Sequence, residues 1–457
     1  MHTAPLKEPT IKIKVPRVAA PRKRTLVRPE NRARPIETFG SAKRIFDVVF
    51  ALAALVIAGP FLCWFVARRR VSGREVFTRT ERVGKYGQRF IQYGLSGVSQ
   101  DRLLHDLPVL LNILAGRMSF VGPRPASPGD PVLKAMGRAR LAVKPGLICC
   151  WWLRKRGNID FDDEAASDRE YLDTACLSTD LGIVLRTIPA MAFSERRDLA
   201  PRTLDILGIR IDNLSMSETL HWIRMKLSSD GQAFVCMTNA HCANISCRNR
   251  AYQEALLSSG LNLADGIGLR IAAKLKRTPI RQNVNGTDLF PRLCDMLQTS
   301  GDSIYLLGGR PGIAHSVAEW IGKQYPDTVV AGYRDGYFPP CDEDSVAEAI
   351  RHSGASILLV AMGVPGQELW IRRNLPKTGV RVAIGVGGLF DFYSGRIPRA
   401  PVWMREVGLE WTYRLIQEPG RMWRRYLIGN WTFLARHLLF EFKVYRAGAY
   451  TRSEKQL

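Results

Sequence analysis

The stretch SIYLLGGRPG, Ser303–Gly312, decides the fold of the C-terminal half of the chain. A short β-rich run ends there in paired glycines, and a helix-like segment follows it. Five further runs repeat the pattern: FVCMT, LNLAD, TVVAGY, ILLVAMG and RVAIGVGG. Short strands that alternate with helical segments of roughly 10–15 residues are typical of a parallel α/β sheet. We therefore expect such a sheet within residues 202–398, with ligands at the carboxyl ends of its strands.

Polar side chains and glycines follow several of these strands, where a ligand would bind. They are Thr238, Asn239, Asp265, Gly308, Gly309 and Gln367. Glycines allow a backbone to approach a phosphate, and free N–H groups at a helix start favour an anion. Taken alone, Asp265 is more readily explained as a helix N-cap, the commonest use of Asp before a helix. No Asp-x-Asp pair stands at a strand end, because Asp342–Asp344 follows two prolines and predicts a helix start.

The run Phe46–Ala67, FDVVFALAALVIAGPFLCWFVA, is the only long apolar segment. As a helix its 22 residues would cover roughly 33 Å, about one bilayer core. Lys43 and Arg44 precede it and Arg68–Arg70 follows, whereas a simple span favours positive charge on one side. Gly59-Pro60 favours a bend. We predict a re-entrant helix that returns to the face it entered; a true span and a buried core helix are the alternatives.

The overall composition limits the partners. The chain has 457 residues, enough for two or three domains, and a formal net charge of +24. Such a charge favours nucleic acid, anionic lipid or phosphorylated substrates. The apolar run favours lipid, and no base-stacking or groove-reading module is recognisable, so we expect no nucleic acid. The nine cysteines are scattered without a Cys-x-x-Cys pair, which indicates a reducing, cytoplasmic setting.

The N-terminal half carries the motifs ERVG and LxxLPxxxNxLxGxMSxVGPRP, then a Pro-Gly segment. Together with the anchor, they make residues 38–193 resemble the monotopic polyprenyl-phosphate sugar-phosphate transferases of bacterial surface-polysaccharide synthesis. The resemblance implies an Asp-Glu dyad and Mg²⁺, but His105-Asp106 stands at the dyad. Imidazole is a poor Mg²⁺ ligand. We predict a degenerate site in which Arg82 and Arg124 could still bind a lipid phosphate. Mg²⁺ is needed only if this domain is active, in which case one chain performs two steps.

The C-terminal half carries TNAH, ADGIG, NGTDL, GVPGQE and RAPxWMxxxGLEWxYRLxQEP. With these motifs, residues 204–438 closely resemble the WecG/TagA/CpsF family of inverting glycosyltransferases. The resemblance implies a Rossmann-like fold, a UDP-sugar donor, a polyprenyl-diphosphate-linked acceptor and no metal. It also implies that Asp265 is the base that takes the acceptor proton. An arginine that the family places before NGTDL is missing, although Arg281 is near.

We assign substrate binding to residues that match this family's pocket, to the glycine turn and to the Arg/Trp-rich tail. They are Thr238, Asn239, Asn285, Gly308, Gly309, Gln367, Arg414, Arg421 and Arg424. Trp and Arg together are also typical of membrane interfaces.

The sequence therefore predicts five segments. They are a disordered basic arm at 1–40, the re-entrant anchor at 41–70, a small α+β degenerate transferase domain at 71–198, the α/β glycosyltransferase domain at 202–398 and a C-terminal appendage at 399–445. We expect the protein at the cytoplasmic face of the bacterial inner membrane, in contact with its lipid. A homo-oligomer is compatible with the sequence, and a non-catalytic membrane scaffold is the rival from another functional class.

Overall fold

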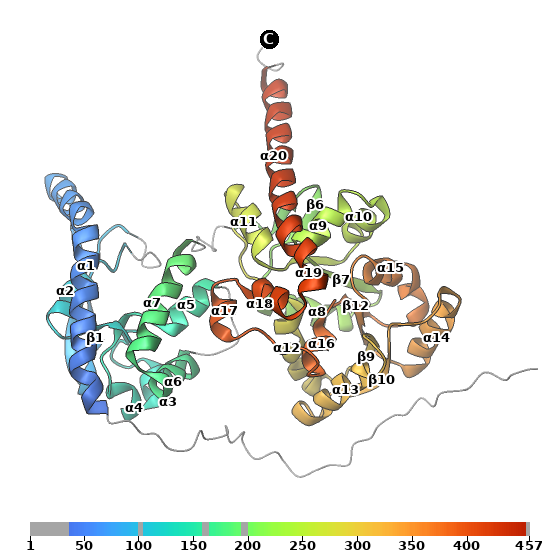
Figure 1. Cartoon of the computed structure of the whole chain (residues 1–457), viewed down its shortest axis with the longest axis horizontal. Coiled ribbons are helices and arrows are strands. Elements are labelled where there is room, and N and C mark those ends of the chain that lie inside the picture. Colours follow the sequence, from blue (N-terminus) through green and yellow to red (C-terminus); the bar gives the residue numbers. More distant parts are fainter. Residues whose placement is uncertain (1–35, 99–103, 158–163, 193–199, 454–457) are drawn as a thin grey trace, which may run out of the picture. The chain divides into compact units, whose positions relative to one another are not determined.

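The computed structural model describes residues 36–98, 104–157, 164–192 and 200–453. Most of the predicted basic arm therefore lies outside the described residues. The chain forms two compact units, one within residues 22–194 and one within residues 195–457. Their elements are labelled in Figure 1.

The C-terminal unit is built on an eight-stranded sheet in the order β10-β9-β11-β12-β7-β8-β6-β5. The strands are β5 (Thr203–Ile206), β6 (Ile209–Asp212), β7 (Ala233–Thr238), β8 (Leu261–Ala264), β9 (Ser303–Gly308), β10 (Val329–Arg334), β11 (Ile357–Ala361) and β12 (Val382–Gly385). All neighbouring pairs are parallel except β5–β6. The predicted parallel α/β sheet is confirmed, and each of the six predicted strands is present. The antiparallel β5–β6 edge was not predicted.

The central strands are apolar throughout because helices cover both faces of the sheet (Figure 1). In β11, Ile357 and Leu359 join the core on one face, and Leu358 and Val360 join the core on the other. The covering helices are α8 (Met216–Leu227), α9 (Ala240–Ser246), α10 (Arg250–Leu257), α11 (Ile267–Leu275), α12 (Gly286–Ser300), α13 (Ile313–Gln324), α14 (Glu343–Ser353), α15 (Gly366–Thr378) and α16 (Leu389–Tyr393). A 3-10 turn, Pro340–Asp342, leads into α14, which confirms the predicted helix start.

A chain of helices completes this unit. They are α17 (Val402–Glu406), α18 (Glu410–Gln417), α19 (Pro419–Trp423), the π-helical turn η3 (Arg424–Ile428) and α20 (Gly429–Ser453). The start of α20 is docked on the sheet domain, because Phe433 and His437 are fully buried and His437 Nε2 lies 3.1 Å from the Ala272 carbonyl oxygen. Beyond this contact α20 projects away from the sheet (Figure 1).

The N-terminal unit is a small α+β assembly. Its elements are α1 (Ile36–Val71), the antiparallel pair β1 (Phe77–Val83) and β2 (Arg89–Leu95) joined by η1 (Lys85–Gly87), α2 (Val109–Leu114), α3 (Pro131–Met136), α4 (Arg138–Leu141), α5 (Cys150–Gly157), α6 (Glu164–Thr174), α7 (Leu177–Ala192) and the parallel pair β3 (Ser119–Val121) and β4 (Gly146–Ile148).

The apolar run forms one continuous helix, not the helix–break–helix hairpin expected from Gly59-Pro60. Pro60 lies inside α1, which continues to Val71. A proline removes only its own N–H donor, and the remaining hydrogen bonds can carry a helix across it with a bend. Figure 1 shows α1 turning aside toward its C-terminal end. The segment Gly40–Val71 is long and apolar enough to cross a membrane, and only 6% of its most apolar window is buried.

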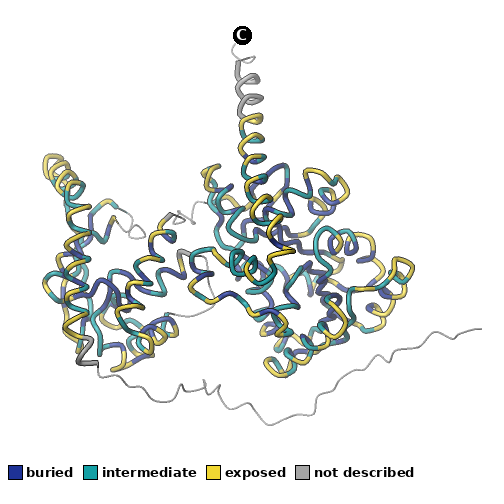
Figure 2. The backbone as a smooth tube through the Cα atoms, in the orientation of Figure 1, coloured by how far each residue is buried: buried dark blue, intermediate teal, exposed yellow. Residues whose placement is uncertain are grey.

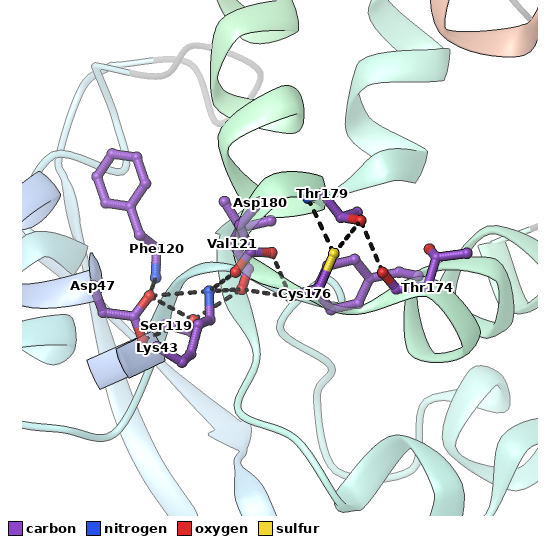
Figure 3. A network of polar contacts seen from close by, with 10 residues as sticks. Lys43, Asp47, Ser119, Phe120, Val121, Thr174, Cys176, Thr179 and Asp180 are labelled. Carbon is purple, nitrogen blue, oxygen red and sulfur yellow. Dashed lines mark hydrogen bonds and ion pairs between the residues drawn. The ribbon is translucent and has the colours of Figure 1, made fainter. Parts of the chain in front are cut away.

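The cations before the apolar run are used inside the protein, so the expectation that both flanks face a membrane surface is wrong for Lys43 and Arg44. Lys43 Nζ lies 3.1 Å from Asp47 and 2.6 Å from Asp180, and it donates to the Val121 carbonyl (Figure 3). Arg44 donates to two main-chain carbonyls at the end of α2. The N-terminal part of α1 is therefore locked into the folded unit by polar contacts as well as by packing.

Candidate active site

Asp265 stands directly after β8, at the carboxyl edge of the sheet. Its own N–H donates to the Thr238 carbonyl at 2.8 Å, which ties it to the end of the neighbouring strand β7. The next residue, Gly266, has a φ of 86° and is the N-cap of α11, with no side-chain cap. Asp265 is therefore not the N-cap of α11, and the structural explanation that the sequence favoured for it is wrong. Its carboxylate does not cap the helix that follows it.

The surroundings of Asp265 make its carboxylate more basic than usual. Burial, followed by the negative charge of Glu410, raises its pKa to about 6. A hydrogen bond from Asn239 and the positive charge of Arg425 act in the opposite direction. The carboxylate is thus ionised at neutral pH but binds a proton more readily than an exposed Asp, which suits a general base.

Asn239 holds this carboxylate in place. Its Oδ1 caps α9 by accepting the N–H groups of His241 and Cys242, at 3.0 and 3.2 Å. Its amide N–H₂ is left to donate to Asp265. One side chain therefore fixes both the start of α9 and the orientation of Asp265. Its predicted contact with a substrate stays a prediction.

Arg425 is one of the arginines of the Arg/Trp-rich tail, and it was not among those assigned to substrate binding from the sequence. It belongs to η3, and its charge lowers the pKa of Asp265. Burial, together with Arg425, lowers the pKa of His241 to about 4, so this imidazole is neutral at pH 7. The density of arginines in the tail was a visible signal, but it did not identify Arg425 as the one beside Asp265.

The three predicted tail arginines occupy different places. Arg414 lies against Gly388 after β12, with its guanidinium carbon 5.2 Å from the centre of the Phe392 ring. Arg421 and Arg424 are exposed and contact their own segment, through Glu418 and Trp423 respectively. Only Arg414 of these three is seated among the strand ends.

A second charged cluster lies close to Asp265. Arg399 pairs with Asp288 at 2.7 Å and with Glu410 at 3.3 Å. The negative charge of Asp288 contributes to the raised pKa of Asp265, while Arg399 holds the pKa of Asp288 below its usual value despite burial. The side chain of Asn285, a predicted substrate ligand, caps α12 and also bonds the Asp288 carboxylate.

Residues 204–447 match the sequence model of the glycosyl transferase WecG/TagA/CpsF family. This chain belongs to the WecG/TagA/CpsF family of glycosyltransferases. Two relatives support the assignment, both carrying the name N-acetylglucosaminyldiphosphoundecaprenol N-acetyl-beta-D-mannosaminyltransferase. The Bacillus subtilis (strain 168) protein is 35% identical over 210 residues, 45% of this chain and 78% of its own length. The Bacillus spizizenii (strain W23) protein is 32% identical over 217 residues, 48% and 83% of the two lengths. Residues 99–194 match a second model, bacterial sugar transferase, so both predicted resemblances are confirmed.

In this WecG/TagA/CpsF glycosyltransferase the glycine turn after β9 serves the packing of strand ends. Gly308 has a φ of 132°, and a Cβ there would lie 2.4 Å from the Ala361 carbonyl oxygen of β11. The Gly309 N–H donates to that same oxygen at 3.0 Å. The sequence had suggested that this N–H could bind a phosphate, but it is already bonded within the protein.

Three other predicted or nearby residues also have partners within the protein. The Thr238 hydroxyl donates to Asn262 Oδ1 at 2.6 Å, and Thr238 is buried. Gln367 is buried and bonded on both sides of its amide. Arg281, considered as a substitute for the missing arginine, pairs with Glu218 of α8 at 2.9 Å.

The degenerate transferase site is closed by contacts among its own side chains. His105 Nδ1 lies 3.0 Å from Asp106 Oδ1. Arg82 donates to Gln92 and Ser127, at 2.9 and 2.6 Å.

Its second arginine is neutralised, because Arg124 pairs with Glu164 at 2.6 Å and with Asp130 at 2.7 Å. No group of three or more metal-binding side chains occurs in the described parts of the chain. One imidazole beside one carboxylate does not fit Mg²⁺, which prefers several oxygen ligands, and we derive no step through this ion.

Proposed function

We propose that this glycosyltransferase moves an N-acetylhexosamine from its UDP derivative to an N-acetylglucosaminyl-diphospho-polyprenol, with inversion at the anomeric carbon. N-acetylmannosamine is the first sugar to test, because both relatives are named for its transfer. The observation that carries the proposal is Asp265. It is a partly buried carboxylate with a raised pKa, oriented by Asn239 beside Arg425 at the strand ends.

In this mechanism Asp265 takes the proton of the acceptor hydroxyl as that oxygen bonds to the anomeric carbon of the donor. The bond from that carbon to UDP breaks, and UDP leaves with the electron pair. Arg414 and Arg425 are placed to bind diphosphate groups, since arginine forms paired hydrogen bonds with phosphate oxygens. Asn239 keeps the carboxylate aimed throughout.

The first prediction concerns the nucleotide product. Purified full-length protein in detergent, given UDP-N-acetylmannosamine and a synthetic N-acetylglucosaminyl-diphospho-lipid, should release UDP, and chelation with EDTA should not slow it. With polyprenyl phosphate in place of the primed acceptor, we expect neither UDP nor UMP. UMP release from polyprenyl phosphate would instead support the bifunctional alternative and activity at His105 and Asp106. An inactive wild type with every primed acceptor would favour the scaffold.

We also propose that α1 attaches the protein to one face of the membrane without crossing it. The near end of α1 is bound to its own unit through Lys43 and Arg44. At the far end, Arg69 donates to the Glu75 carbonyl and to the Ser96 hydroxyl, at 2.9 and 3.2 Å. Ser96 follows β2, which is bonded to α2 by the side chain of Asn112. Contacts of one folded unit with both ends of α1 support attachment from a single face.

A second lipid contact is proposed for the tail. Exposed apolar residues repeat along η3 and α20 at the spacing of one helix face: Leu427, Trp431, Leu438 and Phe442. Figure 2 shows exposed residues recurring along the described part of this projecting helix. An exposed apolar face with tryptophan among arginines is typical of a helix at a membrane surface. We place both contacts at the cytoplasmic face of the inner membrane, where nucleotide sugars are made.

Labelling tests the one-face attachment. Ser41→Cys and Ser72→Cys place thiols at exposed positions near the two ends of α1. In intact spheroplasts a membrane-impermeant maleimide should label neither, and after permeabilisation it should label both, as read by mass spectrometry of the two peptides. Labelling of one position alone in intact spheroplasts would establish a spanning helix.

A further inference from the structure

The first turn of α15 contains a carboxylate that the proposed mechanism does not use. Glu368 is 1% exposed. Its Oε1 accepts a hydrogen bond from Gln367 Nε2 at 2.8 Å, whereas its Oε2 has no hydrogen-bond partner in the described part of the chain. No cation within those residues forms an ion pair with it. A buried carboxyl group without a cation is costly, so its presence needs a reason.

The side-chain amide of Gln367 gives a reason for a carboxyl group at this buried position. Its Oε1 accepts the Gly387 N–H at 3.0 Å, while its Nε2 donates to Glu368. A carboxylate oxygen without a proton only accepts, so the amide must turn its N–H₂ toward Glu368 and its oxygen toward Gly387. The opposite orientation would set N–H against N–H on one side and oxygen against oxygen on the other. Glu368 therefore decides which way Gln367 points.

The turn after β12, to which Gln367 is bonded, is closely packed on two sides. A Cβ on Gly385 would lie 2.9 Å from Gln367 Nε2, and a Cβ on Gly388 would lie 2.5 Å from Arg414 Nη2. Gly387 between them has a φ of 57°. The turn after β12 is thus pressed between the Gln367 amide and the Arg414 guanidinium, and a shift on one side reaches the other.

We propose that Glu368 is a positioning residue for glycosyl transfer, because through Gln367 it fixes the Gly387–Gly388 turn on which Arg414 is seated. The inference rests on the proposed function, since it assigns Arg414 to substrate binding. It also gives Gln367 a different role from the direct substrate contact expected from the sequence. Burial raises the pKa of Glu368 to about 7. Its unpartnered Oε2 can hold a proton while Oε1 still accepts from Gln367, so the link survives in both protonation states.

Two substitutions of similar size separate positioning from folding. Glu368→Gln keeps an oxygen that can accept from Gln367, and kcat/KM for the UDP-sugar should stay within about threefold of wild type. Glu368→Leu removes the acceptor and leaves an apolar side chain, which should fold as well as wild type but lower kcat/KM by about tenfold. Thr378→Val removes a buried hydroxyl that donates to the Leu375 carbonyl in the last turn of α15, and as the matched control it should leave kcat/KM unchanged.

Hydrogen exchange gives a readout that does not depend on turnover. The Gly387 amide should exchange faster in Glu368→Leu than in wild type, and at the wild-type rate in Glu368→Gln. Equal exchange in all three proteins, or equal activity of Glu368→Leu and wild type, would overturn the inference. If the leucine variant does not fold, Glu368→Met replaces it. An inactive wild type would count against the proposed function alone, because the exchange comparison would still decide the positioning role.

A double-mutant cycle tests the route. If Glu368 acts through Gln367, adding Glu368→Leu to Gln367→Leu should cause no further loss of kcat/KM. Additive losses would mean that Glu368 supports the fold independently of Gln367, and would also overturn the inference.

Discussion

Asp265→Asn should lower kcat by about 1000-fold, the size expected when a positioned general base is lost. Asparagine has the shape of aspartate and can still bond to Asn239, so the pocket should keep its geometry and KM for the UDP-sugar should change little. In the wild type, kcat/KM should rise with pH through about 6, because the carboxylate must be ionised to accept a proton. This limb should be absent from the residual activity of the variant. Initial rates of UDP release from pH 5 to 9 measure both effects.

Stability separates the catalytic role from a structural one. The folded-state pKa of Asp265 is raised above the usual 3.8 to about 6, so ionisation disfavours the folded state. Below about pH 4 the carboxyl is protonated in both states and the cost vanishes, whereas above about pH 6 it is fully present. Asp265→Asn should therefore match wild type in thermal stability at pH 4 and equal or exceed it at pH 8.

Asp302→Asn is the control for this pair of measurements. Asp302 precedes β9, at the amino edge of the sheet, and should leave both rate and stability unchanged. A full-rate Asp265→Asn enzyme would remove Asp265 from the mechanism. An equal loss in both variants would point to a general effect of lost charge.

The sheet was readable from the sequence because its strands are apolar on both faces. Runs such as Ile357–Ala361 stand out against the polar helices between them. The β5–β6 edge was missed because polar residues alternate with apolar ones in both strands, Thr203 and Asp205 in β5 and Arg210 and Asp212 in β6, so neither strand forms an apolar run. The partners of Asp265 could be predicted only in part. Asn239 is an ordinary N-cap for α9 in the sequence, and nothing local shows that its amide also donates to Asp265.

Arg425 could not be singled out from the sequence, because it lies where the helical geometry changes. The segment Arg424–Ile428 is a π-helical turn, which adds a residue to the turn and shifts the direction of the side chains. Arg424 stacks on Trp423, while Arg425 reaches the surroundings of Asp265. A regular period of 3.6 residues does not describe such a turn, so it does not give the directions of Arg424 and Arg425.

The second large effect we expect comes from replacing Lys43, whose environment was wrongly predicted from the sequence. Next to an apolar run, a lysine is typical of a membrane surface. Its counter-ion Asp180 lies far along the chain in α7 and cannot be found from local pattern. Lys43→Met should leave Asp47 and Asp180 buried without a cation and destabilise the N-terminal unit by about 3 kcal/mol, as when one partner of a buried pair is removed. Calorimetry of the full chain in detergent measures this loss of stability.

Arg70→Met is the control. Arg70 is an exposed cation of the same helix, and its replacement should not change the free energy of unfolding measurably.

The pH dependence identifies the cause of this loss. Burial already raises the pKa of Asp180 above its usual value, and removing Lys43 should raise it further. A carboxyl with a raised folded-state pKa destabilises the fold as pH rises through that pKa. The deficit of Lys43→Met should therefore be largest at pH 8 and shrink toward pH 5, and adding Asp180→Asn should recover part of it at pH 8. If Lys43→Met behaves like Arg70→Met at every pH, Lys43 contributes nothing to docking α1. The near end of α1 would then be free to leave the folded unit, and the two ends of α1 could lie on opposite faces of the membrane.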